Sequence, residues 1–332
     1  MKWTLPLFVS YLAVACWAQA AGIPTPTKVV VVIEENHSLS EIIGSVGSAQ
    51  DLAAPTLNAW ARGGALMTSS FGVTHPSQPN YLALFSGSTQ GITDDGVHAR
   101  FSGANLGSEL IAAGKTFAGY SQNLPSNGSD VASAAAGAYE RKHNPMTQFT
   151  NLVTAGSNSA VNKVFNLANF PIASGTDYSF LPNVSFVVPD QNNDMHDGTI
   201  TQADTWLITN LGAYQQWAAT HNSLLIVQWD EDDSSASNHI PTIFSGPMVV
   251  PGNYSETINH YNILRTIEDM YGTSHAGAAA TTAAITDIWL VPEPAARWLA
   301  IVGGLGFWVL CGRRRASEPL SRRSASNAPD ET

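Results

Sequence analysis

The chain has 332 residues, of which 44% are hydrophobic and 12% are charged, and it is long enough for one large domain with a full-sized core. Between Ala21 and Pro292, 8 Lys and Arg stand against 22 Asp and Glu, and this acidic balance argues against a nucleic-acid partner, which requires basic residues. Cys16 and Cys311 both fall in apolar end segments, so the expected domain has neither a disulfide framework nor a thiolate metal site.

The first 20 residues have the layout of a secretory signal peptide. One lysine precedes an apolar stretch from Leu5 to Trp17, and Ala18-Gln19-Ala20 supplies the small residues of a cleavage site. A membrane anchor is the weaker alternative because the apolar stretch is short, and Ala13 is a poor match for a lipoprotein signal ending at Cys16. We therefore expect residues 1–20 to direct the protein out of the cytoplasm.

Residues 21–290 alternate strands with helices, as α/β domains do. The strands are expected at residues 28–33, from 65 onward, 116–120, 184–188, 224–227 and 240–244. The helices are expected at residues 55–62, from 79 onward, 105–113, 202–219 and 261–271. The Ser-, Gly- and Asn-rich residues 121–137 are expected to form a loop or insertion. Because strands that alternate with helices pair in parallel, we predict a mostly parallel central sheet with helices on both faces.

A candidate nucleophile lies in the segment His75-Pro76-Ser77-Gln78-Pro79-Asn80-Tyr81. Proline suits the first position of a helix because it has no N–H to lose, so a helix is expected to begin at Pro79. Ser77 would then lie just before a helix N-terminus, where free N–H groups and the helix dipole favour a phosphate. Asn80 could donate a hydrogen bond to the same anion. The alternative is a proline-rich loop that only caps a core helix.

Three of the expected strands end in acidic or amide residues. Glu35 and Asn36 follow the first strand, residues 190–197 follow the strand at 184–188, and Asp230 and Glu231 follow the strand at 224–227. Open α/β sheets place their ligands at the carboxyl ends of the strands. Carboxylate and amide oxygens suit a hard divalent cation, although one such cluster alone is more often a turn or a helix cap. Together the three clusters predict a metal site.

The C-terminal segment has three parts in a characteristic order. Pro292-Glu293-Pro294 is followed by an apolar run from Trp298 to Gly312 and then by Arg313-Arg314-Arg315. This order resembles the PEP-CTERM sorting signal of exported bacterial proteins. The resemblance implies that residues 291–316 hold the chain in the inner membrane until exosortase-like machinery processes it, with the arginines on the cytoplasmic side. The polar tail at 317–332 is longer than such signals usually carry, so a plain C-terminal anchor is the alternative.

The motifs together resemble the bacterial phosphoesterase family, which contains acid phosphatases and phospholipases C and belongs to the alkaline phosphatase superfamily. They are Glu35-Asn36-His37-Ser38, His75 to Tyr81, His143-Asn144-Pro145, Pro189-Asp190 with His196-Asp197, and Asp230-Glu231 with Asn238-His239. The resemblance spans about Lys28 to Gly272. It implies an alkaline-phosphatase-like fold.

The resemblance also implies that Ser77 is the nucleophile and forms a phosphoseryl intermediate. A serine hydroxyl is a poor nucleophile near neutral pH, and coordination to a metal favours its alkoxide. The implied ligands of one divalent metal ion are Glu35, Asn36, Ser77, Asp230 and Glu231. Because these ligands are oxygen atoms, Ca, Mg or Mn is favoured, with Zn as the alternative. Two-zinc members of the superfamily carry Asp–His where this chain has Asp230-Glu231, so a single metal is favoured.

Other polar residues of these motifs receive roles by the same resemblance. Asn80 and His143 are implied to bind phosphate, and His75 either joins them or fixes the loop by hydrogen bonds. His196 and His239 are the candidates for the general acid that protonates the leaving oxygen. The residues that could instead hold a second metal or contact phosphate are Asp190, His196 and His239.

The sequence therefore predicts an exported, metal-dependent phosphoesterase, best described as an acid-phosphatase-like phosphomonoesterase acting on a small phosphate ester. A phospholipase C-type phosphodiesterase is an alternative because it shares the nucleophile and metal motifs. A catalytically inactive surface protein is the non-enzyme alternative, but such a protein would be expected to lose some of the polar set. A sulfatase is rejected because Tyr81 stands where its Cys/Ser-x-Pro-x-Arg motif requires arginine.

Overall fold

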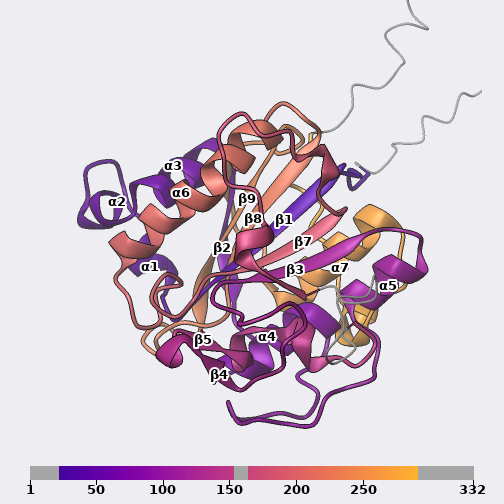
Figure 1. The fold of residues 1–332 in the computed structure, drawn as a ribbon. Helices are drawn as coiled ribbons and strands as arrows, with labels where there is room; N and C mark the ends of the chain where they lie inside the picture. The colour runs from indigo at the N-terminus through magenta and orange to yellow at the C-terminus, as the bar shows by residue number, and fades with distance from the viewer. Residues whose placement is uncertain (1–21, 153–163, 291–332) are drawn as a thin grey trace, which may run out of the picture. The chain divides into compact units, whose positions relative to one another are not determined.

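The computed structural model describes residues 22–152 and 164–290, which form an α/β fold around one mixed sheet (Figure 1). The predicted signal peptide (residues 1–20), sorting segment (291–316) and polar tail (317–332) lie outside the described residues. Within the described ranges, no helix is both long and apolar enough to cross a membrane.

The main sheet contains nine strands in the order β10-β2-β9-β8-β1-β7-β3-β6, with β11 paired to β2. Their bounds are β1 Lys28–Glu34, β2 Ala65–Phe71, β3 Phe117–Ser121, β6 Val164–Asn166, β7 Val184–Val188, β8 Ser223–Trp229, β9 His239–Ser245, β10 Gly252–Tyr254 and β11 Ile258–Asn259. All neighbours pair in parallel except β9, which is antiparallel to β8 and β2. The predicted mostly parallel sheet is confirmed. Residues 230–238, which join β8 to β9, are too few for the crossover of about a dozen residues that a parallel pair needs.

The central strand β1 determines where the site forms. It lies between β7 and β8, with Val31 opposite both Phe186 and Ile226. Its alternate side chains enter two separate core clusters, Val29 and Val31 on one face and Val30 on the other. A run of β-branched residues fits a strand that is buried on both faces. The residues that follow β1 therefore emerge at the middle of the sheet's carboxyl edge.

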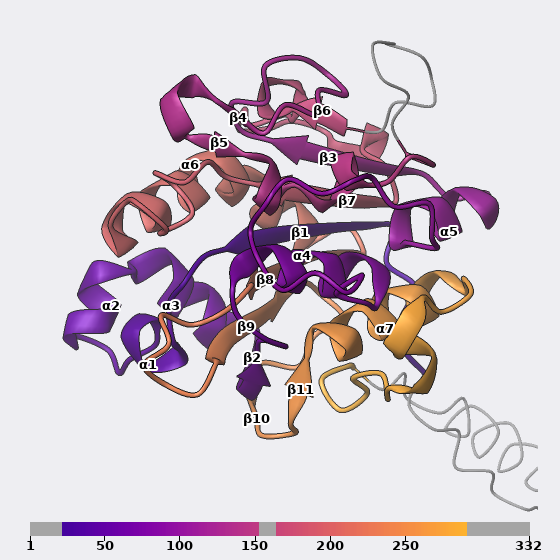
Figure 2. The same ribbon diagram turned by 90° about the horizontal axis from the view of Figure 1, so that it is seen from below.

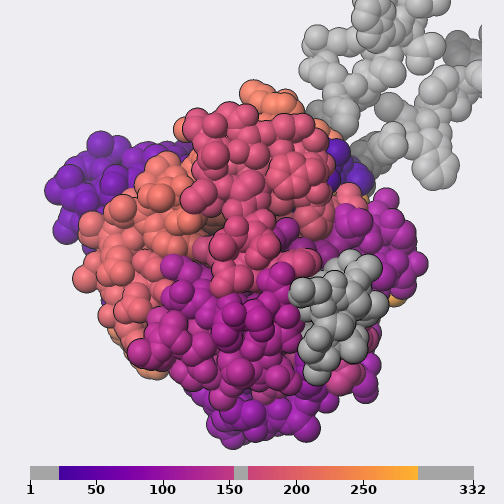
Figure 3. All heavy atoms as spheres, in the orientation of Figure 1, coloured from indigo at the N-terminus to yellow at the C-terminus, as the bar shows by residue number. Residues whose placement is uncertain are grey.

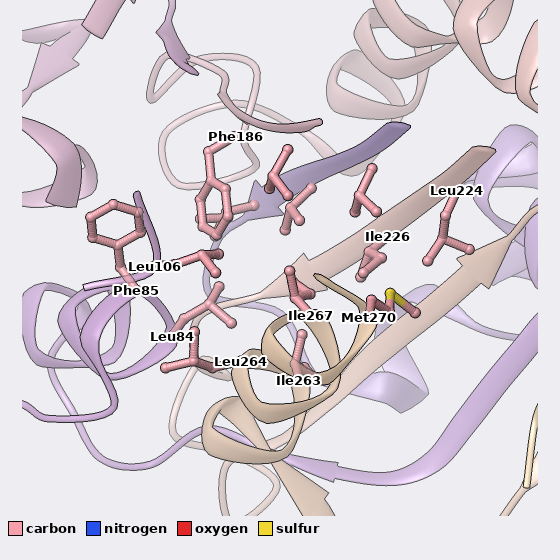
Figure 4. Close-up of a cluster of buried hydrophobic side chains, with 14 of the residues drawn as sticks. Leu84, Phe85, Leu106, Phe186, Leu224, Ile226, Ile263, Leu264, Ile267 and Met270 are labelled. Atoms are coloured by element: carbon pink, nitrogen blue, oxygen red, sulfur yellow. The ribbon is translucent and has the colours of Figure 1, made fainter. Parts of the chain in front are cut away.

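Helices cover both faces of the sheet (Figure 2). They are α1 Leu39–Ile42, α2 Ala49–Ala53, α3 Pro55–Gly63, α4 Ser77–Ser86, α5 Leu106–Ala112, α6 Ile200–Ala218 and α7 His260–Tyr271. Residues of α4, α5 and α7 share one core cluster, and residues of α1, α3 and α6 share the other. Figure 4 shows Leu84 and Phe85 of α4 beside Leu264 of α7 in the first cluster. Each such buried side chain stabilises the fold by about 1.5–3 kcal/mol, so packing holds α4 in place.

Two local features differ from the sequence-based expectation. Helix α4 begins at Ser77, with Pro76 as its N-cap, rather than at Pro79. Proline is tolerated in the third helical position because the first N–H groups of a helix have no acceptor within it. The expected loop at 121–137 contains a short strand, β4 Ser133–Ala134, which pairs with β5 Tyr139–Glu140. The 3-10 helices are η1 Ala135–Gly137, η2 Arg141–His143, η3 Pro145–Gln148, η4 Leu167–Asn169, η5 Tyr178–Phe180 and η6 Gly277–Thr281.

Candidate active site

The polar residues predicted at three strand ends meet at the carboxyl edge of the sheet. The backbone N–H of Glu35 donates to the carbonyl of Asp194 at 2.7 Å, which ties the end of β1 to the loop after β7. The N–H of Asp230 donates to the carbonyl of Glu34 at 3.1 Å, which ties the end of β8 to β1. Helix α4 packs across the same strands through the core cluster of Figure 4, and this brings Ser77 to the same place.

Ser77 lies between two buried carboxylates. Ser77 is 2% exposed, and its Oγ is 3.1 Å from Glu35 Oε2 and 3.0 Å from Glu231 Oε1. A serine hydroxyl carries one hydrogen and can donate one full hydrogen bond at a time. Three oxygen atoms at this spacing therefore suit a cation between them better than they suit one shared proton.

Asn36 faces the same two carboxylate oxygens. One terminal atom of its amide lies 3.1 Å from Glu35 Oε2 and 3.3 Å from Glu231 Oε1. As nitrogen it would donate to both oxygens, and as oxygen it would add a further ligand for a cation. Its φ of 49° is in the left-handed region, which asparagine adopts more readily than most residues. This turn directly after β1 directs the Asn36 side chain toward the carboxylates of Glu35 and Glu231 beside Ser77.

The carboxylates of this cluster are buried without enough hydrogen bonds. Glu35 is 0% exposed and Asp230 is 1% exposed, and Asp230 Oδ2 has no hydrogen-bond partner. Burial, followed by repulsion from neighbouring carboxylates, raises the pKa of Glu35 and of Asp230 well above the usual range. Uncompensated buried carboxylates are costly, and a divalent cation would compensate them. The oxygen set of Glu35, Asn36, Ser77, Asp230 and Glu231 therefore fits a hard cation.

His143 forms the inner wall of the cluster. Its Nε2 is 3.2 Å from Glu35 Oε1, its Nδ1 is 3.5 Å from Asp194 Oδ2, and its ring stacks on Tyr81 with 5.2 Å between ring centroids. Burial lowers the pKa of His143 well below the usual value, which favours the neutral ring, the form that can bind a metal. Glu35, His143 and His196 also bring potential ligand atoms within 4.8 Å of one another, a second group that could hold a metal.

His196 lies at the more exposed side of the cluster. Its Nδ1 is 2.7 Å from Asp197 Oδ1, and its Nε2 is 3.4 Å from the Nζ of Lys142. Lys142 is in turn 3.1 Å from Asp95 Oδ2. The carboxylate of Asp197 fixes the proton of His196 on Nδ1 and leaves Nε2 to face the cluster.

His75 and Asn80 contact Glu231 and organise the loop before α4. His75 Nδ1 is 2.7 Å from Glu231 Oε2 and His75 Nε2 is 3.3 Å from Asp232 Oδ1. The Asn80 side chain accepts from the N–H of Thr74 at 3.0 Å, donates to its carbonyl at 2.7 Å, and lies 3.3 Å from Glu231 Oε2. These contacts agree with a loop-fixing role for both residues, and their binding of phosphate stays a prediction.

Two predicted site residues make their contacts elsewhere. His239 Nε2 is 2.9 Å from the carbonyl of Thr68, and its ring stacks on Phe71 of β2 at 5.0 Å. The two carboxylate oxygens of Asp190 accept from the amides of Asn123 at 2.6 Å and Asn193 at 2.7 Å. Within the described ranges, neither side chain makes a hydrogen bond or ion pair with Ser77, so their predicted roles gain no support from this geometry.

Asp194 is a site residue that sequence reasoning did not single out. It is 0% exposed, its Oδ1 accepts from the N–H of His196 at 2.9 Å, and its Oδ2 faces His143. Asp190, Asp194 and Asp197 all follow the same strand, and nothing in the spacing says which one turns inward. Lys142, which directly precedes His143, is likewise absent from the motifs that the sequence analysis identified.

The loops around the cluster come from distant parts of the chain. The segment after β3 and the segment after β7 lie side by side on the face in Figure 3, joined by the hydrogen bond from Asn123 to Asp190. The N–H of Gln191 also donates to the carbonyl of Ala138 at 2.9 Å. These bonds hold the His196 loop against the segment that carries Lys142.

The chain matches known phosphatases in sequence. A model of the phosphoesterase family matches residues 45–274. The chain is 48% identical to a phosphatidylinositol-3-phosphatase of Mycobacterium tuberculosis, in an alignment that covers 81% of this chain and 85% of that protein. It is 28% identical to a probable acid phosphatase of Kluyveromyces lactis, covering 65% of this chain and 53% of that protein. The chain thus spans about half the length of this fungal relative.

Solved structures show the same fold at low identity. A protein of the alkaline phosphatase superfamily from Vibrio parahaemolyticus gives a TM-score of 0.52 at 12% identity, covering 80% of this chain and 72% of that one. A lipoteichoic acid synthase from Listeria monocytogenes gives 0.51 at 12% identity, covering 81% and 74%. The expected alkaline-phosphatase-like fold is therefore confirmed. With the family match over residues 45–274, the chain belongs to the phosphoesterase family, and it is a hydrolase of phosphoric ester bonds.

Proposed function

We propose that this protein is a metal-dependent phosphomonoesterase with Ser77 as its nucleophile. The observation that carries the proposal is the position of Ser77 Oγ, 3.1 Å from Glu35 Oε2 and 3.0 Å from Glu231 Oε1, at the first residue of a buried helix. The helix N-terminus favours an anion next to Ser77. Glu231 Oε1 is within hydrogen-bond reach of Ser77 Oγ and can accept the proton that Ser77 loses.

The reaction then has two displacements. Ser77 Oγ forms a bond to phosphorus as the bond from phosphorus to the leaving oxygen breaks, and His196, when both of its ring nitrogens carry a proton, gives the Nε2 proton to the leaving oxygen. Water then attacks the phosphoserine and gives a proton to His196 Nε2, the bond from phosphorus to Ser77 Oγ breaks, and Oγ takes its proton back from Glu231 with release of inorganic phosphate. A divalent cation held by Glu35, Asn36, Ser77, Asp230 and Glu231 would stabilise the charge on the phosphoryl oxygens.

The oxygen ligands support a proposal for the metal, and the names of the relatives support a proposal for the substrate class. Oxygen donors favour Ca, Mg or Mn over Zn at the Ser77 cluster. A second ion at Glu35, His143 and His196 is the alternative to phosphate binding by these histidines. The similar proteins are named as a phosphatidylinositol-3-phosphatase and as acid phosphatases, and these names describe the removal of a phosphate group. We therefore propose phosphomonoesters, inositol lipid phosphates among them, as the substrate class.

We also propose that the protein is exported. The support is the signal-peptide layout of residues 1–20 and the three-part segment at 291–316, both of which lie outside the described residues. Processing by exosortase-like machinery and transient residence in the inner membrane belong to the same proposal.

The replacement Ser77→Ala tests the nucleophile. Turnover of an aryl phosphate monoester should fall by at least about 1,000-fold, because the variant lacks the attacking oxygen. Ser86→Ala, at the far end of the same helix, should keep turnover within about threefold. Circular dichroism and thermal unfolding of both variants should show that the fold is kept. Hydrolysis by Ser77→Ala at the wild-type rate would refute the mechanism.

A further inference from the structure

Lys142 is a cation at the site that the family motifs leave without a role. It lies in η2, next to His143, and its side chain is 16% exposed. Its Nζ is 3.1 Å from Asp95 Oδ2 and 3.4 Å from His196 Nε2. The carboxylates of Glu35 and Asp230 also attract it. Lys142 therefore points toward the cluster around Ser77.

The position of Lys142 is fixed by the nucleophile helix itself. Asp95 Oδ2 holds the ammonium, and Asp95 Oδ1 accepts from the N–H of Gln78 at 2.9 Å, one residue after Ser77. The side chain of Gln78 donates to the carbonyls of Asp94 at 3.3 Å and Gly96 at 3.0 Å, which holds this loop against α4. A lysine carries much rotamer freedom, and this clamp removes it before a ligand arrives.

Charge balance at the cluster around Ser77 favours a second cation beside the metal. The cluster contains four buried carboxyl groups, those of Glu35, Asp194, Asp230 and Glu231. A divalent cation offsets two charges, and a phosphate monoester brings two more negative charges into the same space. The guanidinium groups of Arg100 and Arg141 donate to backbone carbonyls of Thr147 and His98 instead. Among the residues that the structure describes around the cluster, Lys142 carries an ammonium that can offset the added charge.

The contact with His196 gives the Lys142 ammonium a ring nitrogen as acceptor beside the cluster. With the Nδ1 proton directed at Asp197, the lone pair of Nε2 accepts from Lys142 at 3.4 Å. A phosphoryl oxygen beside Ser77 would be a stronger, charged acceptor for the same ammonium.

We propose that Lys142 binds the non-bridging phosphoryl oxygens of a dianionic phosphomonoester and sets the preference for monoesters over diesters. A diester has one negative charge less and an ester group in place of one oxygen, so it gains less from the ammonium. Asp95 is the positioning residue for Lys142. This inference rests on the proposed phosphomonoesterase function.

The test compares Lys142→Met with the wild type, both as metal-loaded full-length protein. Binding of inorganic phosphate, measured by calorimetry, should weaken about 10- to 100-fold, which is the usual range for one charge-assisted hydrogen bond. The value of kcat/KM should fall by a similar factor for p-nitrophenyl phosphate and by less than about threefold for bis-p-nitrophenyl phosphate. Lys142→Arg should keep phosphate binding within about threefold of the wild type.

Two further variants separate this role from a structural one. Lys115→Met removes a lysine that precedes β3, at the opposite edge of the sheet, and should leave phosphate binding unchanged. Asp95→Asn should weaken phosphate binding by a smaller factor than Lys142→Met, and it serves as the test variant if Lys142→Met does not fold. Unchanged phosphate affinity in Lys142→Met, or equal losses on monoester and diester, would overturn the proposal. If the wild type hydrolyses neither ester, the function proposal fails, and the phosphate measurement still decides the role of Lys142.

Discussion

Asp230 shows how a single buried residue can serve function at the expense of stability. Its carboxylate is 1% exposed, its Oδ2 has no hydrogen-bond partner, and its neighbours Glu35 and Glu231 are also acidic. Burial first, and these neighbours second, disfavour its charged form and raise its pKa. A cation reverses this balance, because the same carboxylate then has a charged partner.

The replacement Asp230→Asn should therefore have opposite effects with and without metal. In metal-free protein at neutral pH it should raise the midpoint of thermal unfolding, since a neutral amide replaces a buried carboxyl group whose ionisation is disfavoured there. Affinity for Ca, Mg or Mn should fall by at least about tenfold, and the metal should no longer raise the midpoint. Calorimetric titration and thermal scans in chelator and in each metal would measure both effects.

Asp204 provides the matched control for this experiment. It is also a buried aspartate, at 3% exposed, but its two oxygens accept from the backbone N–H groups of Thr56 at 3.1 Å and Leu57 at 2.8 Å, at the start of α3. Asp204→Asn should lower stability and leave metal affinity unchanged. Wild-type metal affinity in Asp230→Asn would show that the ligands have been assigned to the wrong residues.

At the scale of elements, α5 and α7 meet through two glutamates that share a buried position away from the site. Burial, and after it the nearby Glu109, raises the pKa of Glu268 to about 9. Burial also raises the pKa of Glu109. Glu268 Oε1 accepts from the N–H of Ala276 at 2.8 Å, so the side chain is held in place. A raised pKa means that the fold favours the protonated acid over the carboxylate.

Stability from Glu268 should therefore be complete below its ordinary pKa of 4.5 and should be lost as the pH rises toward about 9. Glu268→Gln copies the protonated form, because its amide can still accept from Ala276 and can donate to Glu109. The free energy of unfolding of this variant should exceed that of the wild type by about 1–3 kcal/mol at pH 8 and should match it near pH 4.5. Denaturant unfolding at several pH values measures this difference. A gain that is the same at every pH, or one that Glu140→Gln reproduces, would refute the explanation.

Elements with a strong local signal could be predicted from the sequence, whereas features set by long-range contacts could not. The run of valines in β1 identified a strand buried on both faces, and the residues after β1 and β8 do meet at Ser77. The antiparallel direction of β9 depends on its connection to β8 rather than on its own residues. The inward turn of Asp194, the contacts of His239 with Thr68 and Phe71, and the contact of Lys142 with Asp95 depend on how distant segments pack.

At the scale of the whole molecule, the acidic composition and the site have a common consequence. The described domain carries a surplus of carboxylates, and several of the buried ones gather where a cation and a phosphate would bind. An acidic surface repels a phosphate ester over distances up to about the Debye length of 8–10 Å. The local cations, the metal and Lys142, must therefore provide the attraction at close range.

The two end segments predict on which side of the inner membrane the domain lies. A signal peptide at residues 1–20 would carry the domain across the inner membrane, and the apolar run from Trp298 to Gly312 would stop the transfer there, with Arg313 to Arg315 on the cytoplasmic side. Ser77 and its metal site would then face the periplasm or the outside, where phosphate esters from the surroundings arrive.

In cells with a permeabilised outer membrane and an intact inner membrane, added protease should degrade the domain while a cytoplasmic marker enzyme stays whole. A chain truncated after Leu290 should appear as soluble periplasmic protein with full activity, because the described fold ends there. Protection of the domain until the inner membrane is lysed would contradict export, and the substrates would then have to be sought in the cytoplasm.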